Sequence, residues 1–180
     1  MEYKELPVKG LVEFFPRVFG DSRGAFFESY SARVFEQACI TDPFVQDNQS
    51  VSQKNVLRGL HFQNPPYAQG KLVRVISGRA LDVAVDLRKN CPTYGEVVKV
   101  LLEAEKHNML YIPPGFAHGF VALEDQTVFF YKCTNFYHPA SDSGLRWNDP
   151  DLNIDWGVTD PLVSEKDQQL PFLKEFDSPF

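Results

Sequence analysis

The chain has 180 residues, of which 18 are Lys or Arg and 24 are Asp or Glu, so its formal charge is -6 at pH 7. This acidic balance argues against a general nucleic-acid binder or a protein of anionic membrane surfaces, because both need a basic face. The length fits one domain, residues 1–180, with a sizeable hydrophobic core.

Short strands separated by turn residues dominate the predicted elements. In chain order the expected strands cover residues 44–51, 56–63, 71–77, 80–87, 97–103, 109–112, 119–123 and 127–133. We expect a short helix after the cap residue Ser31 and another after Ser164, in the segment SEKDQQ. The stretch KLVRVISGRALDVAVDLRK, with its turn at 77–79, predicts a hairpin with one buried face. Many short strands with short turns indicate an all-β fold, an antiparallel sandwich or barrel.

Residues 56–63, VLRGLHFQ, read as a buried strand that contains two unexpected polar residues, Arg58 and His61. A guanidinium keeps its proton in proteins and is costly to bury without an anion, so Arg58 predicts a negatively charged ligand. Regular alternation along the strand puts Arg58 and His61 on opposite faces. If one pocket used both side chains, a β-bulge at Gly59 would be needed to bring them to the same face.

Polar residues at the ends of other strands point to the same kind of pocket. The segment IPPGFAHGF at 112–120 has two prolines and a glycine turn before His118, and the triplet QGK brings Lys71 to the start of a strand. Because the open ends of β-barrels hold ligands, these side chains predict a binding site there.

Reduced cysteines and the absence of an export signal are expected. Cys39, Cys91 and Cys133 are odd in number and show no CxxC spacing, which favours free thiols over disulfides or a zinc site. The start MEYKELPVKG has no apolar core of a signal peptide, and no later run is long enough to cross a membrane. These features predict a cytoplasmic protein.

The chain resembles the dTDP-4-dehydrorhamnose 3,5-epimerase family, a branch of the cupin fold, over roughly residues 10 to 170. The segments that carry the resemblance, in order, are VFGDSRGAFFESY, FVQDN, NVLRGLHFQNPPYAQGKLVRV, DVAVDLRK, PTYGE, IPPGFAHGF, FYKCTNFYHP and WNDPDLNIDW. It implies a cupin-type antiparallel jelly roll with a few short helices. It also implies inversion of carbons 3 and 5 of dTDP-4-keto-6-deoxy-D-glucose, giving dTDP-4-keto-L-rhamnose, by acid and base groups acting through an enolate and without a cofactor.

The resemblance also implies a role for particular residues. His61 is the expected base, paired with Asp167, while Lys71 stabilises the enolate and Tyr131 is the acid on the opposite face of the sugar. The implied substrate-binding residues are Arg23, Phe26, Glu28, Gln46, Asn48, Arg58, His118, Tyr137, Asp142 and Lys166. Asp142 stands where family members often carry Glu, so its contact is expected to be lost or bridged by water.

Family members are homodimers whose N-terminal strands cross to the neighbouring chain. The resemblance therefore implies a homodimer in which Arg23, Phe26 and Glu28 of one chain complete the pocket of its partner. The expected partner molecules are thus a thymidine diphosphate sugar and a second copy of the chain.

Three other functions stay open at this point. Metal-dependent cupins pair an HxH segment with PxGxxH, but this chain has His61-Phe62-Gln63, and an amide is a poor substitute ligand, so no metal is expected. A related epimerase for one carbon, or a ketoisomerase, would share the base. A silent nucleotide-sugar-binding cupin would need neither His61 nor Tyr131 as acid and base.

Overall fold

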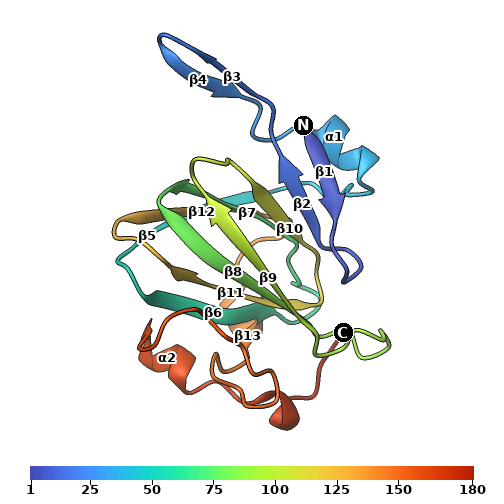
Figure 1. Ribbon diagram of the computed structural model, residues 1–180. Helices are drawn as coiled ribbons and strands as arrows, with labels where there is room; N and C mark the ends of the chain where they lie inside the picture. The colour runs from blue at the N-terminus through green and yellow to red at the C-terminus, as the bar shows by residue number, and fades with distance from the viewer.

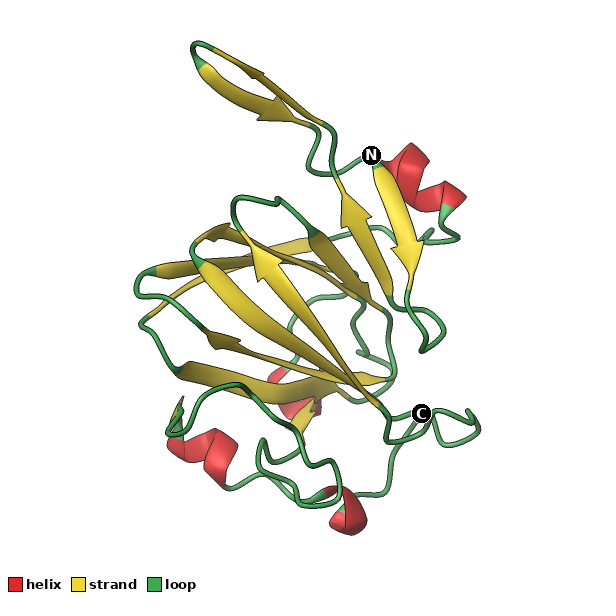
Figure 2. Cartoon of the chain, in the orientation of Figure 1, coloured by secondary structure: helices red, strands yellow, loops and turns green.

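Two β-sheets face each other in the computed structural model, which describes all 180 residues (Figures 1 and 2). The first sheet has the order β1 (Glu2–Glu5), β2 (Val12–Phe15), β10 (Met109–Ile112), β7 (Lys71–Ser77), β12 (Thr127–Cys133) and β5 (Gln46–Ser52). The second has the order β13 (Asp142–Gly144), β6 (Val56–Gln63), β11 (Phe116–Ala122), β8 (Arg79–Asp86) and β9 (Val97–Glu103). All these pairs are antiparallel, and β14 (Leu162–Val163) adds to β6 in parallel. The predicted all-β, jelly-roll class is confirmed.

The main core lies between the two sheets. Inward side chains of the first sheet, such as Val73 and Phe129, pack against Ala84 and Phe120 of the second. The rings of Phe120 and Phe129 are stacked, with centroids 3.8 Å apart, so they join the two sheets at the centre of the sandwich. This contact fixes the spacing of the sheets beside the cavity described below.

The C-terminal segment covers the outer face of the second sheet, as the orange and red ribbon in Figure 1 shows. Val83 and Val85 of β8 point to this side, where Leu152 and Trp156 pack against them. The other face of β8 points into the sandwich. Both faces of this strand are therefore buried, and the prediction of a single buried face was wrong.

The predicted hairpin of residues 71–87 was also wrong. The turn at Gly78 joins β7 of the first sheet to β8 of the second, so the two strands belong to different layers and do not pair with each other. Their apolar content is explained by this crossing, because each strand helps to enclose the same interior. Alternation along one strand does not reveal which neighbour it pairs with.

The two expected helices are present and short. In α1 (Ala32–Gln37) the residue before the helix is Ser31, as predicted, although its side chain makes no capping bond. In α2 (Glu165–Gln168) the Oγ of Ser164 accepts a hydrogen bond from the backbone N–H of Asp167 (3.2 Å). Two 3₁₀ helices, Pro139–Ser141 and Leu173–Glu175, complete the helical content. None of these helices has the length and apolar character that a bilayer crossing requires.

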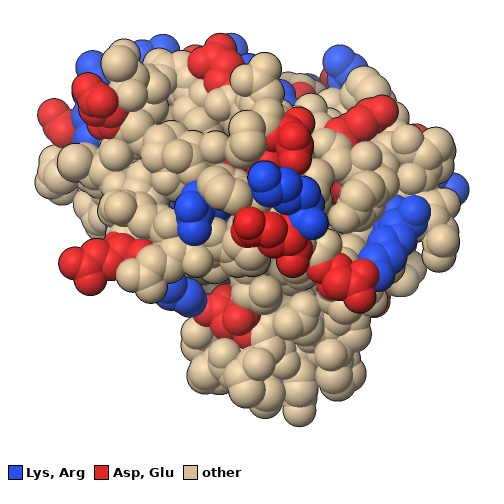
Figure 3. Space-filling model, turned by 90° about the horizontal axis from the view of Figure 1, so that it is seen from below, with Lys and Arg blue, Asp and Glu red and all other residues tan.

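An isolated hairpin projects away from the sandwich. It consists of β3 (Val18–Asp21) and β4 (Gly24–Phe27), and it extends beyond the end of the two sheets at the top of Figure 1. Its large apolar side chains are uncovered, because Phe26 is 74% exposed and Phe19 is 54% exposed. On the molecular face in Figure 3, basic and acidic side chains are mixed and form no broad area of one sign.

Candidate active site

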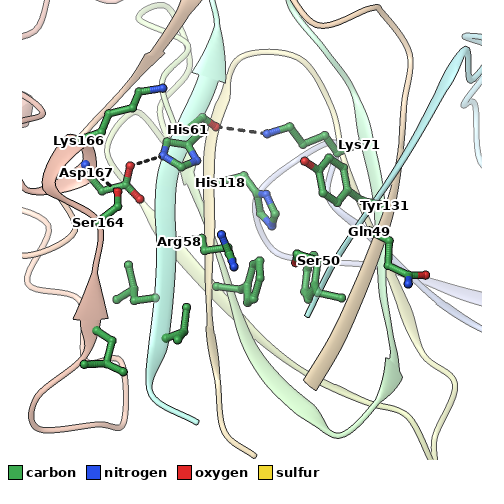
Figure 4. A pocket seen from close by; sticks show the side chains of 15 residues that line it. Gln49, Ser50, Arg58, His61, Lys71, His118, Tyr131, Ser164, Lys166 and Asp167 are labelled. Carbon is green, nitrogen blue, oxygen red and sulfur yellow. Dashed lines mark hydrogen bonds and ion pairs between the residues drawn. The ribbon is translucent and has the colours of Figure 1, made fainter. Parts of the chain in front are cut away.

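A cavity of about 360 Å³ opens between the two sheets. Strands β6 and β11 form one wall, and β7, β12 and β5 form the opposite wall (Figure 4). A second hollow of about 330 Å³ adjoins it, and the residues that line both are His61, Lys71, Tyr131 and Lys166. Of the two residues predicted from the strand ends, Lys71 therefore lies at the junction of the two hollows and His118 lines the first.

The bulge expected at Gly59 is confirmed. In the β6–β11 ladder His61 pairs with His118, whereas Arg58 pairs with Phe120, so three steps along β6 match two along β11. Gly59 has φ +140°, and a Cβ at this position would lie 2.5 Å from the Cα of Gly119. The extra residue reverses the alternation of side chains, and Arg58 and His61 both line the cavity.

His61 is oriented by a carboxylate. Its Nε2 lies 2.8 Å from Oδ1 of Asp167, whose side chain is almost completely buried. Burial alone would raise the pKa of Asp167, but hydrogen bonds from His61, from the N–H of Gly59 and from Ser164 outweigh it and hold the pKa below its usual range. A carboxylate here keeps the imidazole proton on Nε2, which leaves Nδ1 of His61 as a free base.

Lys71 reaches into the cavity from the opposite wall. Its Nζ points to the carbonyl oxygen of His61 at 3.5 Å (Figure 4). Burial lowers the pKa of Lys71, and the nearby carboxylates of Asp82 and Asp142 only partly oppose this effect. The ammonium is therefore poorly solvated, and a developing negative charge in the cavity would be attracted to it strongly.

Tyr131 stands across the cavity from His61, on β12 (Figure 4). Burial raises the pKa of its hydroxyl, and the charge of Arg58 acts in the opposite direction. The hydroxyl therefore keeps its proton at neutral pH. An acid on one wall and a base on the other are what a reaction needs when a proton leaves one face of a substrate and another arrives on the opposite face.

His118 lies on the cavity floor between these two groups (Figure 4). Its Nε2 lies 2.8 Å from Oδ2 of Asp82, which is completely buried. Burial lowers the pKa of His118, and the Asp82 carboxylate opposes the change. The sequence analysis included His118 in the site but not Asp82, which it read as part of an alternating strand.

Cationic side chains line the two hollows. Nε of Arg58 donates to the neutral hydroxyl of Ser52 (3.2 Å), which leaves the charge of the guanidinium for a ligand. Nζ of Lys166 is 2.5 Å from Oδ2 of Asp142, and the hydroxyl of Tyr137 donates to the same oxygen at 3.1 Å. Asp142 thus has two partners within the protein, despite being shorter than Glu.

The amides of Gln46 and Asn48 line the second hollow together with Tyr137. Nε2 of Gln46 donates to Oδ1 of Asn48 (3.0 Å), and Oε1 of Gln46 accepts from the backbone N–H of Tyr137 (2.9 Å). These bonds fix the direction of both amides. Their remaining donors and acceptors are available for a polar ligand.

Three of the predicted residues lie outside this cavity. Arg23 and Phe26 are on the projecting β3–β4 hairpin, and Glu28 follows it directly. Arg23 pairs with Asp21 of the same hairpin (2.6 Å), and both side chains are largely exposed. Within one chain these residues do not join the site.

Gln63 is fully engaged by the backbone. Its Nε2 donates to the carbonyl oxygens of Tyr67 (2.7 Å) and Phe136 (3.1 Å), and its Oε1 accepts from the N–H of His138 (2.7 Å). This residue therefore holds two loops beside the cavity together. No group of three or more His, Cys, Asp or Glu side chains is arranged to bind a metal ion.

Several lining residues were missed by the sequence analysis. They are Gln49, Ser50, Val56, Leu57, Phe120, Phe129, Leu162 and Ser164. Strand alternation could have predicted two of them, because Phe129 lies on the same strand face as Tyr131 and Phe120 lies on the same face as His118. The others come from segments whose position depends on the tertiary fold.

Comparisons with known proteins agree on one family. The sequence model of the dTDP-4-dehydrorhamnose 3,5-epimerase family matches residues 5–175 of this chain. A dTDP-4-dehydrorhamnose 3,5-epimerase from Shigella flexneri is 54% identical over 155 residues, 86% of each chain. The structure of dTDP-6-deoxy-D-glucose-3,5-epimerase from Legionella pneumophila in complex with dTDP-4-keto-L-rhamnose is 44% identical, with a TM-score of 0.94 over 98% of this chain and 94% of that one. A 3'-monoepimerase from Streptomyces bikiniensis in complex with dTDP-quinovose is 33% identical, with a TM-score of 0.90 over 94% and 87% of the chains.

Proposed function

The chain belongs to the dTDP-4-dehydrorhamnose 3,5-epimerase family, and on this basis we propose that it inverts carbons 3 and 5 of dTDP-4-keto-6-deoxy-D-glucose to give dTDP-4-keto-L-rhamnose. One observation carries the assignment of residues: His61 with its carboxylate stands on one wall of the cavity, and Tyr131 stands on the other (Figure 4). The enzyme is an isomerase, and its substrate is a nucleotide sugar.

His61 removes the proton. Carbons 3 and 5 both flank the 4-keto group, so the same carbonyl acidifies the hydrogen on each of them. Nδ1 of His61 takes this hydrogen as a proton, while Asp167 holds the other ring nitrogen and stabilises the imidazolium that forms. One base thus serves both carbons once the sugar ring presents each in turn.

Lys71 stabilises the charge that the proton leaves behind. Negative charge builds up on the 4-keto oxygen as the enolate forms, and the ammonium of Lys71 lies in a poorly solvated position from which it acts strongly. The positive charge is in place before the reaction starts, so little reorganisation is needed when the enolate appears.

Tyr131 completes the inversion. A proton that returned from His61 to the same face would restore the starting sugar, so a second donor must face the other side of the ring. The raised pKa of the Tyr131 hydroxyl keeps this donor protonated until the enolate carbon takes its proton.

We place the diphosphate near Arg58 and Lys166, two cationic residues that line the cavity. Arg58 has a neutral hydroxyl as its side-chain partner, and its guanidinium suits phosphate oxygens, which accept two parallel hydrogen bonds. Lys166 lies near the second hollow, where the amides of Gln46 and Asn48 and the ring of Tyr137 provide contacts for the rest of the nucleotide. Arg58 is exposed in the structure, so the sequence-based argument from a buried guanidinium was wrong, and the proposed anion contact is supported by the position of Arg58 at the cavity.

We propose that the projecting β3–β4 hairpin binds to a second copy of the chain in a homodimer. Arg23, Phe26 and Glu28 lie outside the chain's own cavity, and Phe26 is 74% exposed, which is costly for an apolar ring in water. A second copy that receives this hairpin at its nucleotide end would bury the ring and gain a basic residue. A cytoplasmic location stays a prediction, supported by the three free cysteines.

The second candidate is a mono-epimerase. It is favoured by one observation, the structural likeness to a 3'-monoepimerase at a TM-score of 0.90. Both candidates need the same base, oxyanion-stabilising cation and acid, so the cavity residues do not separate them. The difference lies in whether both carbons of the bound sugar reach His61.

Proton exchange tests the assignment directly. The protein is incubated with dTDP-4-keto-6-deoxy-D-glucose in deuterated water, and the ring protons are followed by NMR. Deuterium at carbons 3 and 5 of an inverted product is the expected result, because both new protons come from solvent-exchanged groups. Exchange at one carbon would establish the mono-epimerase, and tight binding without any exchange would establish a silent binder.

A further inference from the structure

A buried carboxylate behind the cavity floor has no role in the steps above. Asp82 lies on β8 with its side chain inside the sandwich, where its Oδ2 is 2.8 Å from Nε2 of His118. Its other oxygen, Oδ1, is buried without any hydrogen-bond partner. A buried acceptor in this state costs stability, so Asp82 is poorly explained as a structural residue.

The neighbouring carboxylate on the same strand shows the contrast. Asp86 is also completely buried, but its oxygens accept from the side chains of Arg88 and Thr93 and from the N–H of Arg88. Asp86 is thus a satisfied structural group, with donors on both oxygens. The single protein partner of Asp82 is the imidazole of His118, and this imidazole lines the cavity.

The contact decides which nitrogen of His118 carries the proton. A carboxylate oxygen at 2.8 Å accepts a hydrogen bond, so Nε2 must be the protonated nitrogen. Burial lowers the pKa of His118 even though the Asp82 carboxylate opposes this change, so near pH 8 the ring is neutral and Nδ1 keeps a lone pair. Such a nitrogen accepts hydrogen bonds and does not donate them.

We propose that Asp82 is a positioning residue, which holds His118 in the tautomer with the proton on Nε2 so that Nδ1 accepts a hydrogen bond from a hydroxyl group of the keto sugar. The inference rests on the proposed function for the identity of the sugar. It gives His118 a task that differs from that of Lys71. Lys71 donates to the oxygen that becomes negative, whereas His118 fixes the ring through a hydroxyl that keeps its proton.

The tautomer is tested by ¹⁵N NMR on the whole protein labelled at histidine, near pH 8, where unpaired imidazole is neutral. We expect a pyrrole-like signal for Nε2 of His118 and a pyridine-like signal for Nδ1 in the unaltered protein. In Asp82→Asn the amide nitrogen can donate to Nε2, so the protonated form of Nδ1 should appear. Asp86→Asn is the matched control, and it should leave the His118 signals unchanged.

Kinetics tests whether the tautomer matters for the reaction. Asp82→Asn should lower kcat/KM roughly 10- to 100-fold, by analogy with the loss of a carboxylate that orients a metal-bound histidine. In a His118→Gln background, which has no tautomer to fix, the same change should have an effect of less than about twofold. Asp86→Asn breaks the buried pair with Arg88 and should lower stability, but the folded protein should keep kcat/KM within about twofold of the unaltered enzyme.

Several outcomes would overturn the inference. A proton on Nδ1 of His118 in the unaltered protein would do so without any variant, which covers the case of Asp82→Asn failing to fold. An equal loss of kcat/KM in both backgrounds would show that Asp82 acts by another route. If the unaltered protein had no epimerase activity, the proposed function would fail, while the nitrogen signals would still decide the tautomer.

Discussion

His61 and His118 are cross-strand partners in the β6–β11 ladder, and each is hydrogen-bonded through Nε2 to its own buried carboxylate at 2.8 Å. The two pairs differ in access. The side chain of His61 is 32% exposed, whereas that of His118 is 8% exposed. A substrate in the cavity therefore meets His61 as an accessible base and His118 as part of the floor. This difference in depth supports the different roles proposed for the two histidines.

Removing the base should abolish turnover and spare binding. His61→Ala should lower kcat by roughly 10² to 10⁴, the range for general acid–base groups, while the affinity for dTDP stays within about twofold. Steady-state kinetics and calorimetric titration with dTDP measure the two quantities. His107→Asn is the control, because His107 packs on Phe27 outside the cavity and Asn tolerates its φ of 55°. A parallel loss of dTDP affinity in His61→Ala would mean that the residue is structural.

Loss of Arg58, the proposed phosphate contact, should weaken the affinity for the substrate. Arg58→Ala should raise KM roughly 10-fold or more with a smaller change in kcat, because a contact far from the reacting carbons favours ground and transition states equally. Arg79→Ala is the matched control, since Arg79 is on the surface and pairs with Glu124. An unchanged KM in Arg58→Ala would contradict the assignment of the diphosphate to this side chain.

Loss of the proposed acid should impair inversion without stopping proton removal. Tyr131→Phe keeps the ring but loses the proton, so deprotonation by His61 continues while inversion is impaired. NMR in deuterated water should then show exchange on the starting sugar with at least roughly 10² less inverted product. Tyr111→Phe, on strand β10 of the same sheet and outside the cavity, should behave like the unaltered enzyme. Normal inversion in Tyr131→Phe would remove Tyr131 from the mechanism.

The rate should fall at high pH earlier than a free lysine would predict. Burial lowers the pKa of Lys71 from its ordinary value of 10.5, so the ammonium loses its proton, and its charge, at a lower pH than in water. As pH rises through this lowered pKa, kcat should decline. Lys71→Arg keeps its charge and should move the decline to higher pH, even with a lower maximum rate. A pH–rate profile of both proteins checks the shift, and coincident alkaline limbs would contradict it.

Local patterns in the sequence predicted strands β5 to β12 well, missed β1 to β4, β13 and β14, and did not reveal which strands are neighbours. Alternation located the strand that carries Tyr131, and the caps of α1 and α2 were at the expected serines. The turn at Gly78 was read as a hairpin, although it joins the two layers. The period of a strand reports burial on its faces, and it holds no information about which strand lies beside it.

The site was predicted from residues and resemblance together. The bulge at Gly59 was expected because the resemblance assigned Arg58 and His61 to one pocket, whereas regular alternation gives them opposite faces. The pairing of His61 with Asp167 spans 106 positions and came from the resemblance. Asp82 was missed because its burial and its contact with His118 exist only once β8 and β11 pair.

If the projecting β3–β4 hairpin completes the site of a second copy, as proposed, catalysis depends on enzyme concentration. A chain that lends its hairpin away has no complete site of its own, so specific activity would fall on dilution below the dissociation constant of the pair. It also allows complementation between defective copies. A copy altered at His61 still offers a normal hairpin, and a copy altered at Arg23 still offers a normal cavity. Mixing the two inactive proteins would therefore restore one working site in each mixed pair.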